Sequence, residues 1–200
     1  MQSFTLPTWV NSWLETTGRD LIASAPGDQG YMKMVIALAK ENFMQGAEGE
    51  QGGPFAAAVI HKPTGEILSL GINRVVPLHT STAHAEMVAL ARAQQTLGQF
   101  SLRQENHLDE DDRPYTLYTS AQMCAMCLGA VCWSGVGEVV YGAKAEDTEK
   151  LTGFDEGPIH PHWKEELEKR GIKVTGPVLA QEANAVLKAY KDLSHIIYAG

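Results

Sequence analysis

The alternation of apolar and polar residues predicts a chain in which strands and helices follow one another. Apolar residues recur at helical spacing between residues 31 and 44, which predicts a helix there. Two apolar stretches on either side of the turn Pro63-Thr64-Gly65 predict a β-hairpin. Shorter strands are expected at residues 115–120, 137–143 and 172–176, so the pattern predicts about five strands.

Helical patterns separate these strands. One helix is expected to begin near Ala83, after a loop whose hydroxyl residues can cap it, and to end at Gly98. A second begins near Cys124, and further helical segments are expected at residues 144–151, 164–171 and 181–193. Alternating strands and helices predict an α/β protein, a three-layer α/β/α sandwich with a mixed central sheet.

Length and composition fit one domain. The 200 residues are expected to form a single body over residues 31–200, with residues 1–30 as an N-terminal extension that packs on it. A net charge of −8 argues against binding of a nucleic-acid phosphate backbone. Neither a membrane-spanning apolar run nor a signal-peptide pattern is present in the sequence, so a cytoplasmic protein that does not bind membranes is expected.

All three cysteines of the chain lie in the segment SAQMCAMCLGAVCW. Cys124 and Cys127 are three residues apart, so on a helix they share a face close to its N-terminus, where the helix dipole favours thiolates. By themselves they are compatible with a redox pair, a metal site or a packed core. Cys132 falls off that face and is expected to be a buried apolar thiol.

A second helix start carries the segment TAHAEM. His84 can ligate an ion at this helix end, while Glu86 can reach a water molecule beside that ion. With Cys124 and Cys127 this makes three protein ligands and one open position, which is the pattern of catalytic rather than structural zinc. Glu86 is then the residue that accepts and returns the proton of the attacking water.

These two segments, TAHAEM and YTSAQMCAMCLGAVCWSG, resemble the zinc-dependent cytidine and nucleoside deaminase superfamily. The resemblance extends from about Tyr31 to the end of the chain. GGPFAAAVI, GINRVV, CLGAVCWSG and GFDEGP are similar to bacterial guanine deaminases, which include enzymes that also accept ammeline. The resemblance implies a cytidine deaminase-like fold, one Zn²⁺ per chain, a C-terminal tail that closes the site, a homodimer, and conversion of guanine to xanthine and ammonia.

The resemblance also implies roles for residues outside the two motifs. Glu156 would be a second catalytic carboxylate, whereas Asn73 would hydrogen-bond the edge of the base and Phe55 and Trp133 would wall its faces. Taken alone, Asn73 is more typical of a turn, and the two aromatic residues of a core. The full set of substrate-binding residues that the resemblance implies is Phe55, Asn73, Ala85, Trp133, Asp155 and Tyr198.

The chain departs from the family pattern just before the first cysteine, where Gln122-Met123 replace the usual Glu-Pro. The change borders the pocket and leaves the metal ligands in place, so it is expected to affect substrate preference and rate and not metal binding. Alternative substrates are ammeline, another aminopurine, a pterin, cytosine, a nucleoside or, less favoured by the charge, tRNA adenosine. Two rivals from other classes are a catalytically silent binding protein with the deaminase fold and a thiol oxidoreductase.

Overall fold

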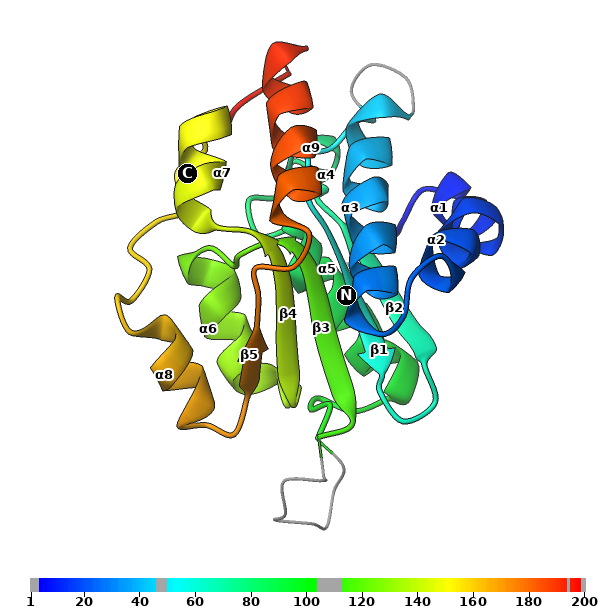
Figure 1. Cartoon of the computed structure of the whole chain (residues 1–200), viewed down its shortest axis with the longest axis vertical. Helices are drawn as coiled ribbons and strands as arrows, with labels where there is room; N and C mark the ends of the chain where they lie inside the picture. The colour runs from blue at the N-terminus through cyan, green and yellow to red at the C-terminus, as the bar shows by residue number, and fades with distance from the viewer. Residues whose placement is uncertain (1–3, 46–49, 104–112, 194, 199–200) are drawn as a thin grey trace.

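A five-stranded sheet forms the centre of the molecule (Figure 1), as the sequence pattern predicts. The computed structural model describes residues 4–45, 50–103, 113–193 and 195–198. The strands lie in the order β2-β1-β3-β4-β5. Their bounds are β1 Ala56–His61, β2 Glu66–Ile72, β3 Tyr115–Ala121, β4 Glu138–Ala143 and β5 Lys173–Thr175.

The sheet is mixed. β1 pairs antiparallel with both β2 and β3, whereas β3, β4 and β5 are parallel to one another. Parallel neighbours need crossover connections, and helices supply them here. The carboxyl ends of β3 and β4 therefore lie at the same edge of the sheet, which is where ligand sites of α/β proteins commonly form.

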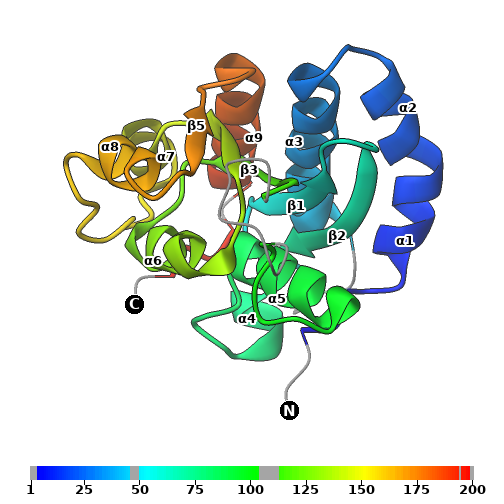
Figure 2. The same ribbon diagram turned by 90° about the horizontal axis from the view of Figure 1, so that it is seen from below.

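Helices cover both faces of the sheet (Figure 2). The helices α3 (Asp28–Met44) and α9 (Ala180–Asp192) pack on one face, and α5 (Ala85–Leu97), α6 (Ala125–Ser134) and α8 (Trp163–Glu168) pack on the other. The short α7 (Ala145–Thr152) lies beside α9. The period of two in β1 divides its side chains between the two cores, because Ala58 faces α3 while Ala57 and Val59 face α5.

Residues 9–23 form a helical segment that the apolar pattern did not predict. It consists of α1 (Trp9–Trp13), the π-helical turn η1 (Leu14–Gly18) and α2 (Arg19–Ala23). Trp9, Trp13 and Ile22 pack against the core between α3 and the sheet. Gly30 permits the close approach of α2 to α3, because a Cβ there would lie 2.3 Å from the carbonyl oxygen of Ile22. The following helix, α3, begins three residues earlier than expected.

Three local details differ from the expectations. A short helix, α4 (Val75–Leu78), lies within the predicted loop after β2. The hydroxyl residues of that loop do not cap α5, whose N-cap is His84. Cys132 is half-buried rather than fully buried.

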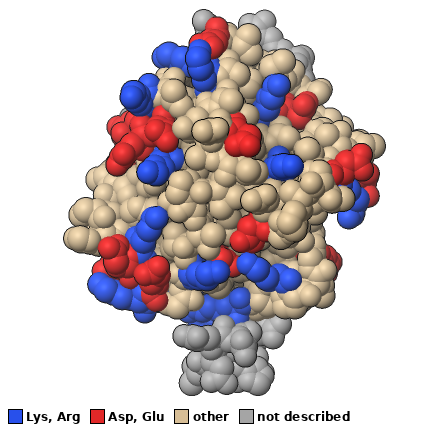
Figure 3. Space-filling view, viewed as in Figure 1, with Lys and Arg blue, Asp and Glu red and all other residues tan. Residues whose placement is uncertain are grey.

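Acidic and basic side chains lie next to one another over much of the face shown in Figure 3. Glu138, for example, pairs with Lys62 at 2.6 Å and with Lys173 at 2.9 Å. None of the helices in the described ranges is both long and apolar enough to span a bilayer.

Candidate active site

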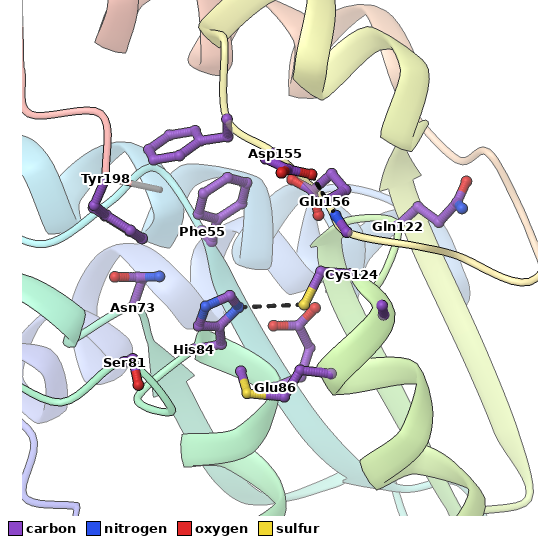
Figure 4. Close-up of a pocket in the computed structure, with 14 residues that line it drawn as sticks. Phe55, Asn73, Ser81, His84, Glu86, Gln122, Cys124, Asp155, Glu156 and Tyr198 are labelled. Atoms are coloured by element: carbon purple, nitrogen blue, oxygen red, sulfur yellow. Dashed lines mark hydrogen bonds between the residues drawn. The ribbon is translucent and has the colours of Figure 1, made fainter. Parts of the chain in front are cut away.

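A cavity of about 360 Å³ opens beyond the carboxyl end of β3, between the N-termini of α5 and α6 (Figure 4). Its size is that of a small-molecule site. The residues around it come from six separate parts of the chain, and they are Phe55, Asn73, Ser81, His84, Glu86, Gln122, Cys124, Ala125, Met126, Phe154, Asp155, Glu156, Gly157 and Tyr198.

The two helix starts bring the predicted metal ligands together. His84 is the N-cap of α5 and Cys124 the N-cap of α6, and both have extended backbone conformations. Side chains at such positions project past the end of the helix instead of lying along its side. Cys127, the third residue of α6, is fully buried behind Cys124.

The geometry of these donors fits a zinc ion. The ligand atoms of His84, Cys124 and Cys127 all lie within 4.8 Å of one another. The Sγ atom of Cys124 is 3.5 Å from Nδ1 of His84. Tetrahedral zinc with sulfur and nitrogen ligands places neighbouring donors about 3.5 to 4 Å apart. These three residues are therefore suited to hold one ion, as the metal-site interpretation of the cysteine pair predicts.

The charges around this group also favour a cation. Hydrogen bonds from the Cys127 thiol and from His84 lower the pKa of the Cys124 thiol to about 4, although burial opposes the shift. The same contact with Cys124, together with burial, raises the pKa of Cys127. Burial alone would lower the pKa of His84, but the thiol contact and the nearby Glu86 raise it instead. A divalent ion among these groups would offset their negative charge.

Glu86 is placed beside the metal ligands without being one of them. It is the second residue of α5 and is only 6% exposed. Burial and the negative charge of Cys124 raise the pKa of Glu86 to about 7, although His84 opposes the shift. The carboxyl group therefore lies inside the cavity in an environment that favours proton exchange.

Glu156 is a second buried carboxyl group on the opposite wall. Its pKa rises to about 8 because it is buried and because Cys124 and Glu86 carry negative charge nearby. The backbone carbonyl of Glu156 accepts a hydrogen bond from the amide of Ala125 at 2.9 Å. The loop that carries Glu156 is thus tied to the first turn of α6, next to the cysteine ligands.

Asn73 presents one side of its amide group to the cavity. Its Oδ1 accepts hydrogen bonds from the backbone amides of Val75 at 3.2 Å and Gly53 at 3.4 Å. Its Nδ2 is buried and has no hydrogen-bond partner among the residues described. Because backbone N–H groups need an acceptor, Oδ1 must face them, and Nδ2 is left as a donor close to the Tyr198 hydroxyl group at the cavity wall. The sequence alone had left both the donor and the acceptor roles open.

Aromatic rings form the wall above Asn73 and His84. Phe55 and Phe154 meet edge to face with ring centroids 5.4 Å apart, and Tyr198 lies 4.9 Å from Phe154. Burial and the neighbouring Tyr190 raise the pKa of Tyr198, so this residue is a neutral phenol. Phe154 was not among the expected pocket residues, although it belongs to the GFDEGP segment that was singled out.

Two of the predicted substrate-binding residues lie outside the cavity. Trp133 is 84% exposed on the outer side of α6, so the prediction that it walls the pocket within this chain is wrong. Trp133 lies six residues after Cys127, a rotation of about 240° around the helix axis, which turns it away from the ligand face. Ala85 is fully buried where α5 packs on the sheet, and it is not part of the wall either.

The remaining predicted residues lie at the cavity rim or just behind it. The Asp155 carboxylate lines the cavity and accepts a hydrogen bond from the Gly157 amide at 2.8 Å, which shapes the loop. Gln122 also lines the cavity, and its Oε1 accepts a hydrogen bond from the Ala145 amide at 3.3 Å. Met123 is 1% exposed and fills the core behind the metal ligands. The Gln122-Met123 change therefore separates into a wall residue and a core residue.

Comparison with known proteins identifies the family. Residues 26–143 match the cytidine and deoxycytidylate deaminase zinc-binding region. This match spans both helix starts that carry the His84, Cys124 and Cys127 group. The chain belongs to this family and is a zinc-dependent aminohydrolase.

Several of the similar proteins are guanine deaminases. The guanine deaminase of Bacillus subtilis is 34% identical over 142 residues, which cover 71% of this chain and 80% of that protein. The structure of guanine deaminase from Nitrosomonas europaea superimposes with a TM-score of 0.80 and 35% identity, covering 96% of this chain and 97% of that one. A variant of NE0047 in complex with 8-azaguanine is 40% identical with a TM-score of 0.74, covering 82% and 84%.

Proposed function

We propose that this protein hydrolyses guanine to xanthine and ammonia. The observation that carries the proposal is the placing of an aromatic wall, an amide donor and two buried carboxyl groups around one cavity, with the zinc ligands at its base. A planar bicyclic base fits a cavity of about 360 Å³. Guanine offers ring and carbonyl acceptors to the Asn73 amide and N–H donors to a carboxylate. The relatives named above support this substrate.

In this proposal Glu86 moves the protons of the reaction. When bound, a zinc ion held by His84, Cys124 and Cys127 supplies Lewis acidity that lowers the pKa of water. Glu86 takes one proton from the water that attacks C2 of the base, and a tetrahedral carbon forms. Glu86 then gives this proton to the amino group, the C2–N bond breaks and ammonia leaves, and the remaining hydroxyl proton moves to N3, which gives xanthine.

The other cavity residues bind and orient the base in this proposal. Phe55 and Phe154, which contact each other, pack against one side of the base, while Nδ2 of Asn73 donates to a ring acceptor. Glu156 and Asp155 lie where they can accept N–H groups of the base, and Glu156 assists the proton transfers. Tyr198 closes the cavity from the C-terminal segment and excludes water.

The experiment that tests the proposal is a screen for ammonia release by the purified zinc-loaded protein. We expect guanine to be the best substrate in a panel that also contains ammeline, 2,6-diaminopurine, adenine, a pterin, cytosine and guanosine. A larger kcat/KM with another compound would transfer the assignment to that compound. Absence of ammonia from every compound would favour a binding protein with this fold.

The proposal also covers the form of the substrate, the cellular compartment and the oligomeric state. We propose a free nucleobase as the substrate, not a base within a nucleic acid, because the chain carries a net charge of −8 and the cavity is walled by aromatic rings. We further propose a cytoplasmic role in purine breakdown. A homodimer is also part of the proposal, because the exposed side of α6 carries the apolar Trp133 beside Gly129, at which an added Cβ would meet open space.

A further inference from the structure

A second asparagine lies behind the cavity without touching it. Asn42, near the C-terminal end of α3, is 1% exposed. Its side-chain Nδ2 donates to two backbone carbonyl oxygens, that of Gly53 at 2.8 Å and that of Asn73 at 2.9 Å. The backbone carbonyl oxygen of Asn42 accepts a hydrogen bond from the backbone amide of Gly52 at 3.1 Å. One residue of α3 therefore joins the loop before β1 to the segment after β2.

Both of these segments form walls of the cavity. The loop leads directly into Phe55. The backbone carbonyl oxygen of Phe55 accepts a hydrogen bond from the backbone amide of Asn73 at 3.0 Å. The amide of Gly53 in turn contributes to holding Oδ1 of Asn73. The direction of the free Nδ2 of Asn73 thus depends on how the loop and the Asn73 segment are placed relative to each other. Asn42 holds that relative placement from the side opposite the cavity.

The packing around this contact leaves almost no space for displacement. A Cβ on Gly52 would lie 1.9 Å from the carbonyl oxygen of Asn73 and 2.5 Å from Nδ2 of Asn42. A Cβ on Gly53 would lie 2.7 Å from the Tyr198 hydroxyl oxygen. Glycine is the residue that fits at both positions, because the backbone of the loop lies in direct contact with Asn73 and Tyr198. A shift of the loop would therefore move these two residues.

We propose that Asn42 is a positioning residue for substrate binding. Its two hydrogen bonds set the direction of the Asn73 amide and the place of the Phe55 ring, although Asn42 contacts no substrate. The proposal rests on the proposed function for the identity of the base. It predicts that loss of Asn42 weakens substrate binding and leaves the zinc ligands and Glu86, which lie on other elements, unchanged.

The test compares variants of Asn42 with matched variants of Asn184. Asn42→Ser shortens the side chain. Asn42→Asp replaces the two N–H donors with a carboxylate oxygen. Asn184, on α9, donates to Asp147 at 3.1 Å and does not line the cavity, so Asn184→Ser and Asn184→Asp are the controls. Gly52→Ala disturbs the same contact from the loop side.

For the Asn42 variants and Gly52→Ala, we expect KM for guanine to rise about 3- to 10-fold. This is the effect of losing one hydrogen bond between the Asn73 side chain and the base. The value of kcat should stay within about 3-fold of wild type, and zinc should remain at one ion per chain. Asn184 variants should keep the wild-type KM, even where they lower Tm.

Several outcomes would overturn the positioning role. An unchanged KM in folded Asn42 variants would do so, and so would an equal rise in KM for the Asn184 controls. If none of the three variants at Asn42 and Gly52 folds, Asn42 is a structural residue only. If the wild-type enzyme prefers another base, the proposed substrate fails separately, and the same KM comparison is made with that base.

Discussion

Glu86 and His84 show how two neighbouring residues of one helix start divide the work of the site. His84 precedes the first helical turn and points past its end, whereas Glu86 lies within that turn and is buried beside the ligands. Their different backbone conformations bring both side chains to one cavity, although they are two residues apart. In the proposed function, His84 therefore binds the metal and Glu86 is free to move protons.

The first residue-scale prediction separates these roles. Glu86→Gln should retain zinc and lose activity by about 10²- to 10⁴-fold, because the amide cannot accept the proton of water. Metal analysis of the purified variant and ammonia release measure the two effects. Cys124→Ala is the matched variant, and it should lose both zinc and activity. Wild-type turnover in Glu86→Gln would contradict the assignment.

The individual residues also show where sequence reasoning was sufficient. His84, Glu86, Cys124 and Cys127 were predicted because their positions relative to two helix starts define their directions. Trp133 was predicted incorrectly from the family resemblance, although its spacing from Cys127 already turns it outwards. Phe154 and Asn42 were missed because an apolar loop residue and a polar helix residue have no distinctive pattern. Their roles depend on contacts made across the fold.

At the scale of elements, the position of His84 depends on how closely α5 packs on β2. Gly71 in β2 makes this packing possible, because a Cβ there would lie 2.1 Å from the carbonyl oxygen of Ala85 and 2.5 Å from the amide nitrogen of Ala89. These are backbone atoms of the first turns of α5, so no side-chain rotation can relieve the contact.

The element-scale prediction is that Gly71→Ala lowers the free energy of unfolding by about 1 to 3 kcal/mol through overpacking. Urea denaturation monitored by tryptophan fluorescence measures this change. Gly129→Ala is the control with the same added methyl group. Gly129 lies on α6 beside Trp133, so both substitutions are compared in a Trp133→Lys background, which leaves the outer side of α6 uncovered. An added Cβ at Gly129 then meets open space, and the substitution should stabilise the helix by about 0.5 to 1 kcal/mol. Equal effects of the two substitutions would contradict the packing argument.

At the scale of the whole molecule, the outer side of α6 is the feature that the cavity does not explain. Trp133 exposes 84% of its surface there, on the same helix that carries the cysteine ligands. An exposed tryptophan of this kind is typical of a protein interface. The proposed homodimer would cover it.

Trp133→Lys should therefore convert the dimer to a monomer, since a lysine is poorly tolerated in the desolvated centre of an interface. Light scattering coupled to size-exclusion chromatography gives the mass directly. Phe100→Lys is the control, because Phe100 is 85% exposed but does not lie on α6. A wild-type monomer, or loss of the dimer in both variants, would show that the outer side of α6 is not the interface.

The amino-acid sequence was sufficient to predict the layers of the fold and a zinc ion, and it singled out His84, Glu86, Cys124 and Cys127, which the structure brings together. These features follow from local periodicity, from the geometry of helix starts, which act over a few residues, and from the resemblance to the deaminases. The shape of the cavity does not follow from any local pattern. It depends on where Phe55, Asn73, Phe154 and Tyr198 meet, and these residues come from distant parts of the chain. Their contacts are set by packing between α3, the glycine loop and the C-terminal segment, and such packing exists only in the folded molecule.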